Sequence, residues 1–325
     1  MNFSSLHSDA QPDVSLQPVW QREVDSWRDL FAQSARKPSR KRIHALRSLT
    51  LRLRVALDYR LLDQVHDPTA ARAFKRWSNE AKKLRQALEP VRDADVYLAR
   101  LDGLRGTLGG APDSEPKLTP RCLREIGKVE SLLKKQRQKG ADGLAAVIDD
   151  RKKRLKRLTR EMEEALAPEM ASKAGSAVQM ALRVFAGLTS EFPKLDSTNL
   201  HAYRKRLKQA LYLVEFSPKS DPQARRMVAA FRRIRRAVGE WHDWQSLALE
   251  AGRILPEHSK QDGLVSMLDT LAEEALQNAL DLCRRSATQF LKSPGAVGPF
   301  PPRKPVASDP GGHAGDEHCL FDISR

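Results

Sequence analysis

The chain has 325 residues and carries 57 Lys and Arg against 41 Asp and Glu, which gives a formal net charge of +16 at neutral pH. A hydrophobic fraction of 40% excludes a wholly disordered chain, and a positive excess of this size favours polyanionic partners. Its three cysteines lack zinc-cage or disulfide spacing, and we find neither a secretory leader pattern nor a run of roughly 20 apolar residues, so we expect a cytoplasmic protein without membrane association.

Apolar residues recur at helical spacing along most of the chain and runs with period two are lacking, so the sequence predicts an all-α fold. Residues 1–18 and the Pro/Gly-rich residues 293–325 are predicted to be disordered tails. Asp-Pro or Thr-Pro pairs predict helix N-caps at 67–68, 119–120 and 221–222. Predicted breaks between helices fall at 66–68, 106–120, 139–143, 192–198 and 217–223.

The first basic helix is predicted in "KPSRKRIHALRSLTLRLRVALDYRLL", residues 37–62. On a helical wheel its apolar residues share one arc, and a stripe beside that arc carries charge. A second basic segment follows in "AKKLRQALEPVRDADV", residues 81–96. The candidate ligand contacts in this half are Arg40, His44, Arg47, Arg54, Lys82, Arg85 and Arg92.

The same arrangement returns in "LHAYRKRLKQALYLVEF", residues 200–216, and in "FRRIRRAVGEWHDWQS", residues 231–246. Residues 225–239 contain no acid at all, although like charges on one helix repel and are usually diluted with Glu or Asp. This absence indicates a polyanionic ligand. The candidate contacts in this half are His201, Arg204, Lys205, Lys208, Arg225, Arg232, Arg235, Arg236 and His242.

The two halves look duplicated, because 157 positions separate His44 from His201 and 150 separate Asp93 from Asp243. Such a repeat predicts two similar helical bundles related by an approximate two-fold axis. We place the first bundle at residues 19–170 and the second at 171–292.

These segments resemble the signatures of the CHAD family (conserved histidine α-helical domain). "IHALRSLTLRLR" and "LHAYRKRLKQALYLVEF" are similar to its two histidine motifs, and "ALEPVRDADV" and "AVGEWHDWQS" to the segments that follow them. The likeness spans residues 20–290. Three positions depart from the pattern: Leu51 and Leu211 replace expected basic residues, and Glu89 replaces the usual glycine.

The resemblance implies one domain of two antiparallel bundles that binds inorganic polyphosphate, often on polyphosphate granules. Polyphosphate-metabolising enzymes are candidate partners. Because the sequence has neither a phosphate-binding GxxxxGK[ST] loop nor a GxSxG motif, we expect no catalysis. We expect the polymer in a groove between both His-bearing helices and the basic helices at 74–88 and 223–239. No cofactor or metal is expected, and Asp93 and Asp243 are expected to orient neighbouring cations. The balanced run at 151–166 is expected to be a solvated face.

Two alternatives stay open. Non-specific nucleic-acid binding would use the same cations, although the basic stripes lack interleaved aromatic residues and no known module is apparent. A metal-dependent phosphohydrolase is suggested only by the His242-Asp243 pair and by a second such pair at 66–67, without a convincing further ligand set.

Overall fold

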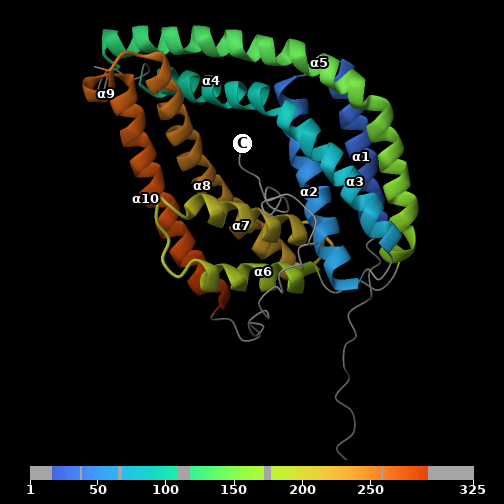
Figure 1. Cartoon of the computed structure of the whole chain (residues 1–325). Coiled ribbons are helices and arrows are strands. Elements are labelled where there is room, and N and C mark those ends of the chain that lie inside the picture. Colours follow the sequence, from blue (N-terminus) through green and yellow to red (C-terminus); the bar gives the residue numbers. More distant parts are fainter. Residues whose placement is uncertain are drawn as a thin grey trace, which may run out of the picture.

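All regular structure is helical in the part of the chain that the computed structural model describes, which confirms the all-α prediction. The described residues are 17–36, 39–64, 68–108, 118–171, 177–257 and 259–291. Figure 1 shows their helices, which are α1 (Gln17–Arg36), α2 (Arg40–Gln64), α3 (Pro68–Ala87), α4 (Glu89–Leu108), α5 (Pro120–Ala171), α6 (Ala177–Glu191), α7 (Leu200–Val214), α8 (Pro222–Ile254), α9 (Ser259–Asp262) and α10 (Leu264–Leu291).

The first core cluster joins α1, α2, α3 and the second half of α5. At its centre the rings of Trp27 and Trp77 meet edge to face with centroids 5.9 Å apart. Each indole finds a buried hydroxyl: Trp27 Nε1 donates to Thr50 Oγ1 at 2.8 Å, and Trp77 Nε1 donates to Thr159 Oγ1 at 3.2 Å. Because buried donors need partners, these bonds fix how α2 and α5 are rotated about their axes.

The second core cluster joins α6, α7, α8 and α10, with the rings of Phe185 and Phe231 in a tilted arrangement at a centroid distance of 4.7 Å. It also takes in Leu51 and Val55 of α2. A third cluster packs α4 and the start of α5 against α8 and α10. The first cluster takes in Ala177 and Phe216 as well, so all three clusters contain residues from both predicted bundles and the halves share their hydrophobic interior.

Helix α5 corrects one prediction, because it runs for 52 residues through the expected break at 139–143. Gly140 lies against α4 instead of ending a helix: a Cβ there would come within 3.1 Å of Val91 Cγ2 and 3.5 Å of Pro90 Cβ. The glycine thus permits close helix packing, and the neighbouring apolar residues Leu144 and Ile148 are buried beside it. In Figure 1 α5 arches over the molecule from α9 and α10 to α1 and α3.

Two of the predicted N-caps are confirmed. Thr119 Oγ1 accepts the amide of Cys122 at 3.1 Å. Asp221 accepts the amides of Gln223 and Ala224 at 2.8 and 3.1 Å, directly before Pro222.

Other predictions lie wholly or partly outside the described residues. Asp67 and the tail at 293–325 lie outside them, as does the predicted N-terminal tail except for positions 17 and 18, which begin α1. None of the described helices is both long and apolar enough to cross a membrane.

Candidate functional site

Four helices bring their cations together around Lys208 of α7. The guanidinium groups of Arg204, Arg92, Arg235 and Arg47 all act on its ammonium group, and they belong to α7, α4, α8 and α2. Burial, followed by these four charges, holds the pKa of Lys208 well below its usual range. We define the central cluster as these five cations and the three histidines around them: Arg47, Arg92, Arg204, Lys208, Arg235, His44, His201 and His242.

Core packing dictates which side of each helix carries the cluster. In α7 the side chains of Leu200, Tyr203 and Leu207 are at most 3% exposed, and in α8 Phe231, Ile234 and Val238 are fully buried. With 3.6 residues per turn, burial of these positions leaves the intervening basic stripe on a different face. The clustering therefore follows from the amphipathic pattern of the sequence.

Two of the three histidines touch each other. The rings of His201 and His242 meet edge to face with centroids 5.0 Å apart, and His242 Nδ1 lies 3.4 Å from Ser246 Oγ. Burial and neighbouring cations, Lys205 first for His201 and Arg204 first for His242, lower their pKa values to about 4 and about 3. Partial burial and nearby guanidinium groups, Arg92 first, also lower the pKa of His44. All three imidazoles are thus neutral at pH 7.

The second-half cations of the cluster have no acidic partner. Within the described parts of the chain, Arg204, Lys208 and Arg235 form no salt bridge, and Arg204 Nε is buried without a hydrogen-bond acceptor. Burial lowers the pKa of Arg204 to about 10, against the opposing effect of Asp243 nearby. Arg235 shares a hydrogen bond with Tyr212, which is neutral at pH 7. These charges are crowded and partly desolvated, and Asp243 offsets only part of the effect of burial on Arg204.

The two predicted orienting carboxylates are both held by arginines. Asp243 accepts from Arg100 at 3.4 Å and lies 3.8 Å from Arg92, and Asp93 pairs with Arg92 at 2.7 Å. Arg100 also lies 4.9 Å above the ring of Trp244. The expectation that Asp93 and Asp243 position neighbouring cations is confirmed.

Arg100 was not among the predicted site residues. It lies eight positions after Arg92 on α4, which is close to the same helical face, and this spacing was the signal that could have found it.

The remaining predicted contacts lie outside the central cluster as defined above, and they differ in how exposed they are. Arg54 and Arg85 are only 8% and 7% exposed, so their side chains offer little surface to a ligand, and we leave them out of the contact set. Arg232 pairs with Glu215 at 2.8 Å, and Arg225 donates to the Lys219 carbonyl at 3.3 Å. Arg40 and Arg236 are exposed, whereas Lys82 and Lys205 are half-buried.

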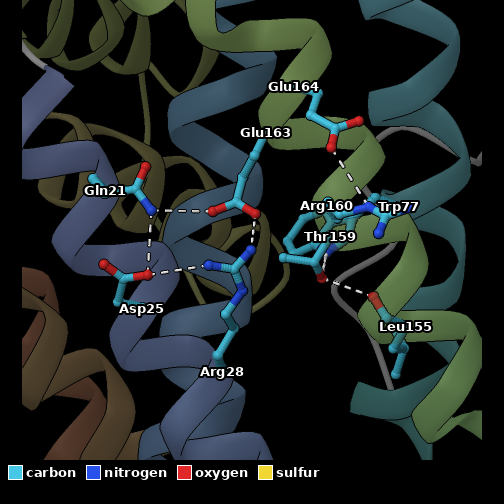
Figure 2. A network of polar contacts seen from close by, with 9 residues as sticks. All are labelled: Gln21, Asp25, Arg28, Trp77, Leu155, Thr159, Arg160, Glu163 and Glu164. Atoms are coloured by element: carbon cyan, nitrogen blue, oxygen red, sulfur yellow. Dashed lines mark hydrogen bonds and ion pairs between the residues drawn. The ribbon is translucent and has the colours of Figure 1, made fainter.

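A second group of cations on the outer face behaves differently. Figure 2 shows Arg28 of α1 reaching Asp25 and Glu163, and Arg160 pairing with Glu164. Arg28 and Arg160 line a concavity of about 360 Å³ together with Lys153, Lys156 and Arg157. Its three arginines all have carboxylate partners on α1 or α5, so their charges are met within this outer face.

A known protein family matches most of this chain. A family model for the CHAD domain matches residues 18–252, which is more than half of the chain. The chain belongs to the CHAD family. The "Crystal structure of the CHAD domain from the plant Ricinus communis" covers 90% of this chain and 96% of its own, with a TM-score of 0.59 and 17% sequence identity, so the two share the CHAD fold. A comparison with curated proteins found no match.

Proposed function

We propose that this CHAD protein binds inorganic polyphosphate at the central cluster and that it does so without catalysis. One observation carries the proposal: Arg204, Lys208 and Arg235 are crowded together and form no ion pair with a carboxylate among the described residues. Crowding of like charges destabilises a protein unless a ligand of opposite charge relieves it. The family's association with polyphosphate supports this choice of polyanion.

The residue types suit a chain of phosphoryl groups. Arg can grip phosphate oxygens with two donors at once, and Lys adds a mobile point charge. A neutral imidazole donates one hydrogen bond and gains a charge when an anion approaches. Cations from four helices can therefore follow successive phosphoryl groups of one polymer. We extend the proposal to location: the protein would gather on cytoplasmic polyphosphate granules, beside enzymes that make or degrade the polymer.

Nucleic acid is the second candidate ligand, because the same cations could neutralise its phosphates. The aromatic residues near the cluster argue against it as the main ligand. Trp241 and Tyr212 are 3% and 5% exposed, and Trp244 packs partly buried against the third core cluster with Arg100 over its ring, so these residues offer little surface for base stacking. A phosphohydrolase finds less support still, because the Asp243 carboxylate is held by arginines. Among the described residues no three His, Cys, Asp or Glu side chains are grouped to share a metal ion.

Competition between the two polyanions tests the proposal. A fluorescent single-stranded DNA oligonucleotide is bound to the full chain, and long-chain polyphosphate or unlabelled DNA is titrated in, with each competitor measured by its phosphate concentration. We expect polyphosphate to displace the probe at a phosphate concentration at least about tenfold lower than that of unlabelled DNA, since it offers more charge per length without bases to accommodate. Displacement at equal or higher polyphosphate concentration would favour the nucleic-acid function.

Binding should also take up protons. A bound polyanion favours the charged form of His201 and His242, so their pKa values rise from about 4 and about 3 on binding. Affinity should therefore increase as the pH falls from about 7.5 towards 5, the range in which the free histidines are still neutral. Calorimetry in two buffers with different ionisation heats measures the uptake directly. Uptake that persists undiminished in the His201→Gln, His242→Gln double variant would contradict this assignment.

A further inference from the structure

The two halves of the central cluster differ at equivalent positions, and the difference concerns charge. By the sequence offsets of 157 and 150, Arg47 corresponds to Arg204, and Glu89 corresponds to Gly239. Arg47 Nη2 lies 2.8 Å from Glu89 Oε1 and its Nη1 donates to the Arg85 carbonyl at 2.8 Å. The first-half arginine is therefore already bound to an anion of the protein itself.

The second-half arginine has no such partner. A Cβ on Gly239 would lie 3.9 Å from Arg204 Nη2, so a side chain at this position would begin in contact with the guanidinium group, and the glycine leaves that space open. Arg204 Nε has no hydrogen-bond acceptor among the described residues. The same two positions thus hold an ion pair in one half and an unpaired cation in the other.

Two further pairs of positions differ in the same direction. Lys208 corresponds to Leu51, which is 7% exposed and packs in the second hydrophobic core. Arg235 is half-exposed beside Lys208, whereas its counterpart Arg85 is 7% exposed. At each of these three positions the second half presents a cation that the first half has neutralised, replaced or buried.

We infer that the polyanion is gripped mainly by the second half, through Arg204, Lys208 and Arg235, and that Glu89 acts as an internal competitor that weakens the first half. This inference rests on the proposed function and deepens it. The Glu89 carboxylate occupies the position on Arg47 where a phosphoryl group would otherwise bind. Because Arg47 also acts on Lys208, its neutralisation lowers the positive potential that the ligand meets.

A reciprocal pair of substitutions tests the inference. Glu89→Gln removes the competing charge but keeps the side-chain shape, and affinity for long-chain polyphosphate should increase about tenfold, as expected for one regained charge-assisted contact. Gly239→Glu builds the missing acid beside Arg204, and affinity should fall by at least about tenfold. Calorimetry with defined long-chain polyphosphate measures both, and thermal unfolding checks that each variant is folded.

Matched controls separate local effects from net charge and size. Glu163→Gln removes the same charge from an ion pair with Arg28 on the outer face, and it should leave affinity within about twofold. Gly239→Gln places a neutral side chain of equal size beside Arg204, and its loss should be much smaller than that of Gly239→Glu. An equal gain from Glu163→Gln and Glu89→Gln, or an equal loss from Gln and Glu at 239, would overturn the inference.

Pyrophosphate binding tests independently whether the second half of the central cluster binds phosphate more strongly than the first. Pyrophosphate is too short to engage all the clustered cations, so it should bind at the unpaired second-half cations. Gly239→Glu should weaken pyrophosphate binding, whereas Glu89→Gln should strengthen it by a smaller factor than it strengthens the binding of long-chain polyphosphate, because only the potential at Lys208 changes. If the wild-type chain binds polyphosphate but the reciprocal variants leave affinity unchanged, this inference alone fails. If the wild-type chain binds no polyphosphate, the proposed function fails as well.

Discussion

Replacing Lys208 and Arg204 together by Glu is expected to reduce polyphosphate affinity by at least about 100-fold, because two charge-assisted contacts are lost and two repulsions appear. The same change should not unfold the protein. Lys208 lies among Arg47, Arg92 and Arg235, so carboxylates there replace like-charge repulsion with attraction. We therefore expect the thermal unfolding midpoint to stay constant or rise while binding is lost. Calorimetric titration and thermal unfolding measured on the same samples check both halves of the prediction.

The outer face supplies the matched control for this double variant. Lys153 and Lys156 form no ion pair with other described residues, and they line the concavity beside Arg28. Replacing both by Glu changes the net charge by the same amount as the cluster variant does. Affinity should fall only slightly, through the smaller long-range attraction. Equal losses in the two double variants would mean that net charge, and not the central cluster, determines binding.

Salt dependence is the second large effect. If about five phosphates are neutralised, a linear polyanion resembling a single nucleic-acid strand should lose about 100-fold in affinity between about 50 and 200 mM salt. The slope of the logarithm of affinity against the logarithm of salt concentration reports how many counterions leave. Removing one cluster cation, as in Arg235→Gln, should make that slope shallower by roughly 0.7. An affinity that is flat across this salt range would rule out the electrostatic mechanism.

The fold was largely predictable because helical periodicity and caps are local properties. Thr119 and Asp221 cap α5 and α8 as their sequence context predicts. The wrong break at 139–143 shows the limit of local signals. A glycine in a helical pattern can end a helix or allow another helix to pack closely against it. Only the position of Val91 on α4 shows that Gly140 allows close packing.

The candidate site, like the fold, was predictable from the sequence in part. Spacing on α7 and α8 was enough to select Arg204, Lys208 and Arg235, since the buried face of a helix fixes its basic face. The burial of Arg54 and Arg85 was not predictable, because it depends on which helices cover α2 and α3. The pairing of Arg47 with Glu89 also joins two helices, and the departure at position 89 was visible in the sequence before its partner was known.

The unbroken helix α5 has a consequence for how the protein would bind a ligand. At 1.5 Å per residue its 52 residues span about 78 Å along the helix path, and it contributes to core clusters on both sides of the molecule. A continuous helix of this kind, together with the shared interior, joins the two predicted bundles into one rigid framework. The protein would then serve as a stiff template, and a flexible polymer would supply most of the conformational adjustment and bear most of the entropy loss.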